Sequence, residues 1–178
     1  MKHAAQTALT LLAAAAMLAG CASARKALTP SASKTIEVAP PEPGAPKPTA
    51  GMDWTYAPVG TNAALTYGAA GGQPKLLLAC AQKSGSVTVG EPGAAAAVNR
   101  ITLISGSAKA TVLAGAQPSP SDPSQMVLSA KFSTLDPIMQ AFAHRRWIAL
   151  PLEGDKVDNL VAHPEGAVAV REFFDFCG

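Results

Sequence analysis

Short segments after residue 52 alternate apolar and polar residues, and this two-residue period predicts β-strands. In residues 126–132, every second residue from Met126 is apolar, while Ser129 and Lys131 lie between the apolar positions. Successive side chains of a strand point to opposite faces, so one face of each segment is expected to be buried. Strands are predicted at residues 62–67, 75–82, 86–89, 101–104, 110–114, 126–132 and 147–152.

The connections between these segments predict antiparallel pairing. The turns 83–85 and 105–107 each contain a glycine and each join two predicted strands. Short connections containing glycine are typical of β-hairpins. Residues 75–82 are apolar on both faces, which predicts a central strand. Pro151 lacks an N–H donor, so its strand is expected at the edge of a sheet.

Two segments show helical periodicity instead. Asp136 is a good N-cap and Pro137 a good first helical residue. The apolar stripe of this predicted helix consists of Ile138, Met139 and Phe142. A second set of apolar residues recurs at helical spacing near the C-terminus: Ala167, Val170, Phe173, Phe174 and Cys177. This pattern favours a terminal helix, although residues 167–170 could instead form a strand.

The expected fold class is mainly β, of the α+β type. Short strands at close spacing predict a small antiparallel β-sandwich or partly open barrel, with one short helix and a C-terminal helix. Composition divides the chain into three parts. Residues 1–20 are rich in alanine, residues 21–51 are rich in proline, and residues 52–178 have the mixed composition of a packed domain.

The first part has the pattern of a signal peptide. Lys2 precedes residues 7–18, which are uncharged and mostly apolar. As a helix these 12 residues would measure about 18 Å, which is too short for a hydrocarbon core of about 30 Å. We therefore expect the apolar region of a secretory signal rather than a membrane span.

The residues Leu18-Ala19-Gly20-Cys21 follow this apolar run and resemble the lipobox of bacterial prolipoproteins. The resemblance covers about the first 21 residues. It implies a diacylglycerol on the Cys21 thiol, cleavage between Gly20 and Cys21, and often acylation of the new amine, for example by palmitate. The alternative is an ordinary secretory signal followed by a coincidental cysteine.

The residues after Cys21 bear on its destination. An Asp directly after the lipidated cysteine resembles a proteobacterial signal for retention in the inner membrane, whereas here Ala22 and Ser23 follow. The resemblance therefore favours the outer membrane over the inner, with the domain facing the periplasm.

The linker that follows contains six prolines: Pro30, Pro40, Pro41, Pro43, Pro46 and Pro48. It is expected to be a semi-rigid spacer, or a leader with no length requirement.

The cysteine count predicts one disulfide. With Cys21 bound to lipid, Cys80 and Cys177 remain in a chain expected to leave the reducing cytoplasm. An even remainder in an oxidising compartment favours a bridge between them. Two buried thiols or an intermolecular bond are the alternatives.

Four polar residues are candidates for a site. His144, Arg145 and Arg146 lie at the end of a predicted helix, where cations suit the negative end of the helix dipole. They could also contact an anion or a phosphate headgroup beside Trp147. His163 is either a solvated loop histidine or a ligand or base.

The sequence contains no motif that carries catalysis. A Gly-x-Ser-x-Gly elbow, a metal-binding pair of histidines and a phosphate-binding glycine loop are all missing from it, so no catalytic residue, metal or cofactor is predicted. The formal net charge of +2 gives no indication of nucleic acid binding.

The expected function is a membrane-anchored envelope lipoprotein with a non-catalytic binding or structural domain. Its partners would be the membrane, through lipid on Cys21, and an envelope protein or peptidoglycan. A small periplasmic hydrolase is the alternative. The placement of Cys80 and Cys177 is also similar to that in membrane-bound lysozyme inhibitors of the C-type. The inhibitory loop of that family contains a tyrosine, and neither residues 84–87 nor residues 105–108 lead to one.

Overall fold

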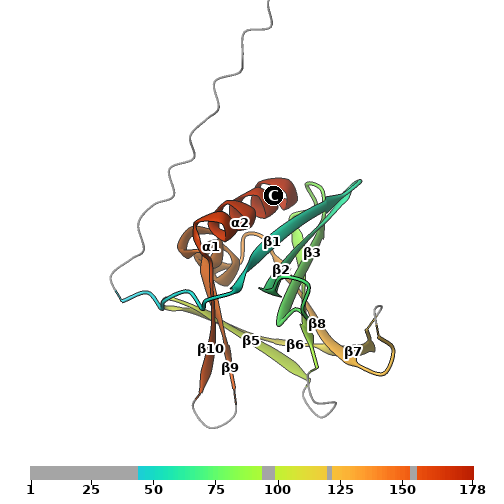
Figure 1. Cartoon of the computed structure of the whole chain (residues 1–178). Helices are drawn as coiled ribbons and strands as arrows, with labels where there is room; N and C mark the ends of the chain where they lie inside the picture. The colour runs from blue at the N-terminus through green and yellow to red at the C-terminus, as the bar shows by residue number, and fades with distance from the viewer. Residues whose placement is uncertain (1–43, 94–98, 120–121, 153–155) are drawn as a thin grey trace, which may run out of the picture. The chain divides into compact units, whose positions relative to one another are not determined.

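The computed structural model describes residues 44–93, 99–119, 122–152 and 156–178. In these ranges the chain forms two antiparallel sheets and two helices (Figure 1). The predicted fold class is confirmed: the domain is a small, mainly β sandwich with a C-terminal helix, and its described strands do not close into a barrel. The predicted signal peptide, Cys21 and the linker as far as residue 43 lie outside the described residues.

The larger sheet has six strands in the order β1-β2-β3-β4-β8-β7. These are β1 (Met52–Val59), β2 (Asn62–Ala69), β3 (Leu76–Ala81), β4 (Ser86–Pro92), β8 (Met126–Ser133) and β7 (Gly115–Pro118). The smaller sheet has four strands in the order β10-β9-β5-β6. These are β10 (Val157–Val161), β9 (Trp147–Pro151), β5 (Arg100–Ser105) and β6 (Ala108–Leu113).

The register of the six-stranded sheet places its apolar positions in rows on one face, which we call the inner face. Leu65 of β2 lies opposite Leu78 of β3, and Leu78 lies opposite Val89 of β4. Val89 in turn lies opposite Ala130 of β8. Leu65, Leu78 and Val89 are fully buried, as expected when every second residue of neighbouring strands faces the core.

The two sheets are joined on both sides of the core. On one side, only Ala114 separates β6 of the smaller sheet from β7 of the larger sheet. On the other side, the indole N–H of Trp54 donates to the carbonyl oxygen of Leu160 at 3.3 Å. Lys75 and Asp158 also form an ion pair there, with 2.6 Å between Nζ and Oδ2. The buried side chains therefore form one continuous core.

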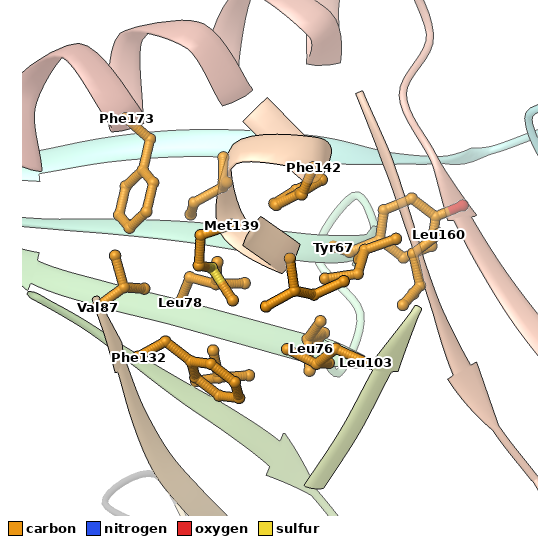
Figure 2. Close-up of a cluster of buried hydrophobic side chains, with 14 of the residues drawn as sticks. Tyr67, Leu76, Leu78, Val87, Leu103, Phe132, Met139, Phe142, Leu160 and Phe173 are labelled. Carbon is orange, nitrogen blue, oxygen red and sulfur yellow. The ribbon is translucent and has the colours of Figure 1, made fainter. Parts of the chain in front are cut away.

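The helices cover the open side of this core. Helix α1 (Pro137–Arg145) inserts Met139 and Phe142 among side chains from both sheets, and neither residue is exposed (Figure 2). Helix α2 (Pro164–Cys177) packs on β1 and β2 (Figure 1). The Trp54 ring lies 4.9 Å from that of Phe142 and 5.1 Å from that of Tyr67, measured between centroids. The helical stripes predicted from the sequence are therefore the faces that pack on the sheets.

Asp136 occupies the N-cap position of α1, but its carboxylate does not cap the helix. Its Oδ2 atom accepts a hydrogen bond from the backbone N–H of Ser133 at 2.7 Å, and no side-chain cap bond is formed. The predicted N-cap position of Asp136 is therefore confirmed, although its side chain makes no cap hydrogen bond. The carboxylate closes the turn that precedes the helix, and Pro137 at the first helical position has no N–H to satisfy.

Helix α2 confirms the helical alternative for the C-terminus, and both of its ends are held by the six-stranded sheet. At the first turn, Asp53 of β1 accepts hydrogen bonds from the backbone N–H groups of His163 at 2.9 Å and Gly166 at 3.1 Å. At the last turn, the backbone N–H groups of Lys83 and Gly85 donate to Phe176 and Cys177 at 2.9 Å. The terminal backbone groups of a helix need such partners.

A disulfide joins Cys80 of β3 to Cys177 of α2. Their Cα atoms are 5.8 Å apart, within the range that a disulfide spans. The pairing agrees with the one predicted from the cysteine count.

The sequence patterns missed three strands and misplaced one. Strands β1, β7 and β10 were not predicted. The strand that contains Pro151 was expected at a sheet edge, and this is wrong, because β9 lies between β10 and β5. The proline is tolerated because it is the last residue of β9, while the pairing with β5 is centred on Ile104 and Ala149.

Candidate binding site

His144 and Arg145 lie in the last turn of α1, as predicted. The His144 side chain is exposed. The Arg145 side chain lies over the turn between β5 and β6, where a Cβ atom built on Gly106 would be 2.5 Å from Arg145 Nε. Gly106 also has a φ of +60°, so both its conformation and its neighbour favour glycine. Arg145 therefore packs against this turn.

Arg146 ends α1 in the left-handed conformation, with a φ of 63°. Its backbone N–H donates to the carbonyl oxygen of Phe142 at 2.9 Å, and its carbonyl oxygen accepts from Ala162 at 3.0 Å. Burial lowers the pKa of its guanidinium, the nearby Arg171 lowers the pKa further, and Asp175 opposes the change. Its backbone joins the end of α1 to the end of β10.

His163 is the N-cap residue of α2. One ring nitrogen, Nε2, lies 3.1 Å from the carbonyl oxygen of Thr49, in the segment that leads into β1. The carboxylate of Asp53 contacts the same turn, and both of its oxygens accept hydrogen bonds from backbone N–H groups there. The imidazole is thus bound to a carbonyl and is not oriented by a carboxylate, as the base of a triad would be.

The predicted polar residues lie where α1 ends and α2 begins, and the carbonyl oxygen of Arg146 accepts a hydrogen bond from Ala162, the residue before His163. His144, Arg145 and Arg146 end α1, whereas His163 begins α2, and none of the four lines either of the two hollows described below. Among the residues that the structure describes, no group of three or more His, Cys, Asp or Glu side chains is placed to hold a metal ion. Within the same residues, neither helix has the length and apolar character needed to cross a bilayer.

The larger hollow lies on the outer face of the six-stranded sheet, opposite the core. It crosses β3, β4, β8 and β7 and has a volume of about 340 Å³. Its apolar floor is made by Leu77 and Ala79 of β3, Gly90 of β4 and Val127 of β8. The other lining residues are Gln73, Pro74, Thr88, Pro92, Gln117, Pro118, Ser119 and Ser129.

Gly90 lies in the floor of this hollow and contributes no side chain to it. A Cβ atom there would point outward, 3.1 Å from Val127 Cγ1 and 3.8 Å from Leu77 Cβ. Gly90 does not have a positive φ, so its backbone conformation does not require glycine. A glycine inside a strand weakens the strand and often marks a place where a ligand or another backbone approaches closely.

A second hollow of about 320 Å³ adjoins the first on the same face. Thr55 and Thr66 form its floor, and Pro74 belongs to both hollows. At Gly68 of β2, glycine is needed because another backbone segment approaches closely. A Cβ atom on Gly68 would lie 3.2 Å from the Cα atom of Pro74. Gly68 therefore lets the loop before β3 pack against β2.

The two hollows together form an uncharged surface. None of the described residues that line them is charged or aromatic. The polar groups available are hydroxyls and amides, such as those of Thr88, Ser129 and Gln117. These groups can donate or accept hydrogen bonds, but they cannot supply a general acid or base near neutral pH. The arrangement suits binding of an uncharged apolar ligand.

The outer-face residues were not recognised as a site in the sequence, although two signals were present. The first is Leu77, which makes the segment around β3 apolar on both faces. The second is Gly90, which directly follows the predicted strand 86–89 and lies inside β4 in the structure. Neither signal shows which strand faces the hollow from the other side, because Val127 lies 37 positions later in the chain.

Comparison with known proteins assigns no family to this chain: no family model, no curated protein sequence and no solved structure matches it.

Proposed function

We propose that this protein is a bacterial envelope lipoprotein with a non-catalytic binding domain. The observation that carries the proposal is Leu18-Ala19-Gly20-Cys21, placed directly after a charged start and a short apolar run. The chain is exported, cut before Cys21 and held on a membrane by lipid on that cysteine. The domain faces the periplasm, and the outer membrane is favoured over the inner.

The disulfide between Cys80 and Cys177 supports export. Disulfides form and persist in oxidising compartments such as the bacterial periplasm, and they are rare in the reducing cytoplasm. The bridge is almost fully buried, with exposed fractions of 7% and 0% for the two residues. Its burial and its position at the end of α2 indicate a structural bond rather than a catalytic one.

The outer-face hollows support binding rather than catalysis. Their lining is uncharged, and the histidines and arginines predicted as candidates lie elsewhere. The sequence leaves a small periplasmic hydrolase as the alternative, but no arrangement of the described residues favours it. A partner in the envelope, such as a lipid, a protein or peptidoglycan, would meet this surface.

Mass spectrometry of the mature protein, combined with palmitate labelling, tests the anchoring. We expect a chain that begins at Cys21, incorporates palmitate and sediments with membranes. Cys21→Ser removes the thiol that receives the lipid and should abolish labelling and membrane attachment. Ser23→Ala, two residues away, is the matched control and should behave as the unaltered protein.

An intact Met1 or an unmodified thiol at Cys21 in the mature protein would refute the lipoprotein proposal. Normal labelling of Cys21→Ser would refute the assignment of the acylated residue.

A further inference from the structure

The larger outer-face hollow excludes several kinds of ligand by its chemistry. Nucleotides, anionic peptides and metal ions are recognised by charged side chains, and the described lining contains none. Sugars and nucleobases usually stack on aromatic side chains, and the lining contains none of these either. What remains is a ligand held by apolar contact.

A peptide fits this surface less well than a hydrocarbon chain does. A bound peptide has backbone N–H and C=O groups that need partners, and recognition of extended peptides normally uses the edge of a sheet. The hollow lies on the face of the sheet, where the backbone groups already pair between strands, as between Gly90 of β4 and Ser129 of β8. A hydrocarbon chain has no hydrogen-bonding groups to satisfy.

The dimensions of the hollow indicate one chain rather than a bulky molecule. Its volume of about 340 Å³ is at the lower end of the range of about 300–1,000 Å³ found for ligand pockets. In its floor, the side chains of Leu77 and Val127 come close together over the backbone of Gly90, where a Cβ atom would lie 3.1 Å from Val127 Cγ1. The hydroxyls of Thr88 and Ser129 lie beside this floor and can contact an ester group.

We propose that the outer-face hollow binds one acyl chain of a membrane phospholipid. The inference rests on the proposed function, because the lipid on Cys21 would keep the domain close to a bilayer. The ligand is a separate lipid, since the acyl groups on Cys21 are needed in the bilayer for anchoring. Removal of each methylene from water should raise the affinity by up to about fourfold until the hollow is filled.

Photocrosslinking in vesicles tests this proposal. The full lipidated protein is reconstituted into phosphatidylethanolamine–phosphatidylglycerol vesicles that contain a phospholipid with a diazirine in its acyl chain. After illumination and digestion, we expect crosslinks on peptides that contain β3, β4 and the start of β8. Gly90→Leu fills the hollow with a side chain and should reduce the crosslinks on these peptides about tenfold.

Two further variants separate loss of the site from loss of the fold. Leu77→Glu leaves Gly90 unchanged but places a charge on the floor, and it should reduce crosslinking to a similar extent. Ala57→Leu adds the same side chain as Gly90→Leu on the same face of the sheet, on the edge strand β1 and outside both hollows, and should leave the crosslinks unchanged. For each variant, a circular dichroism spectrum like that of the unaltered protein and an intact disulfide will show that the fold is retained.

Each outcome decides between the proposals. If Cys21 carries palmitate but no crosslinks are found on β3, β4 and β8, the acyl-chain site is overturned and the lipoprotein proposal stands. The same holds if folded Gly90→Leu is crosslinked as strongly as the unaltered protein. Crosslinking that is equally strong on the outer face of the four-stranded sheet, for example around Thr102, indicates random contact with the bilayer and also overturns the site. Absence of palmitate overturns the proposed function on which the inference rests.

Discussion

At the scale of single residues, Asp53 and Gly166 depend on each other. Asp53 lies on an edge strand, yet its carboxylate caps helix α2 at residues 110 and 113 positions later in the chain. A Cβ atom on Gly166 would collide with the Asp53 carboxylate. The glycine therefore makes room for the cap, and the cap leaves no room for any other residue at that position.

Asp53→Ala should lower the free energy of unfolding by about 1–2 kcal/mol, because it leaves helix N–H groups without a partner. Gly166→Ala should lower it by about 1–3 kcal/mol through the collision with Asp53. In the double variant the collision is gone and alanine is the better helix former, by up to about 1 kcal/mol. The effect of Gly166→Ala should then be close to zero or stabilising.

Urea unfolding of the four proteins measures this coupling as a double-mutant cycle. If the two substitutions have additive effects, the contact between Asp53 and the first turn of α2 does not contribute as described.

Glu91 gives a pH dependence with a definite sign. Burial raises the pKa of this carboxyl above 4.5 in the folded protein. The folded state then binds a proton more tightly than the unfolded chain, so protonation of Glu91 stabilises the folded protein. This stabilisation is complete below pH 4.5 and is lost as the pH rises through the raised pKa. Glu91→Gln should therefore have a higher Tm than the unaltered protein at neutral pH, and the difference should disappear in acid.

Thermal unfolding at several pH values checks the prediction for Glu91. Glu172→Gln alters an exposed residue of α2 and serves as the control. A difference between Glu91→Gln and the unaltered protein that grows in acid would contradict the stated sign.

At the scale of elements, α2 is fixed at three places by the six-stranded sheet. Asp53 holds its first turn, the turn between β3 and β4 holds its last carbonyl groups, and Cys177 is bonded to Cys80. Lys83 adds a hydrogen bond from Nζ to the carbonyl oxygen of Asp175 at 3.0 Å. These contacts fix both ends of α2 to the six-stranded sheet.

Replacing both Cys80 and Cys177 with alanine should lower the free energy of unfolding by about 2–5 kcal/mol. The upper part of this range is expected because the bridge joins residues 97 positions apart, so it restricts the unfolded chain strongly. Denaturant unfolding with and without a reductant provides the measurement. A reductant should lower the stability of the unaltered protein only, and an effect of similar size on the double variant would mean that the bridge is not its target.

At the scale of the whole molecule, one core connects both sheets and both helices. Trp54 contacts Tyr67 of its own sheet and Phe142 of α1, and its indole donates to Leu160 of the other sheet. Because no boundary divides the buried side chains, the described domain is expected to unfold as one cooperative unit.

Tryptophan fluorescence can test this cooperativity. Trp147→Phe leaves Trp54 to report on the six-stranded sheet, and Trp54→Phe leaves Trp147 to report on the four-stranded sheet. In each variant the fluorescence transition should coincide with the transition seen by circular dichroism. Separate transitions for the two probes within one variant would show that the sheets unfold independently.

Strands and helices with a strong local pattern could be predicted from the sequence. The alternation in β2, β3, β4 and β8, the glycine turns between hairpin strands, and the spacing of apolar residues in α1 and α2 all reflect backbone periods that are set within a few residues. The cysteine count likewise predicted the pairing found in the structure. Strands β1, β7 and β10 were missed because tertiary pairing, rather than a strong local pattern, keeps them extended.

Contacts between residues that are distant in the chain could not be predicted, because they arise when the sheets and helices assemble. The cap that Asp53 supplies to α2, the passage from β6 to β7 at Ala114, and the hollow between Leu77 and Val127 all join residues far apart in the chain or in different sheets. The candidate site includes Gly90, and its position between Leu77 and Val127 leaves no periodic pattern in the sequence. The role of Gly90 can be recognised only once β3 and β8 are known to lie on either side of β4, because the pairing of strands is set by the whole fold.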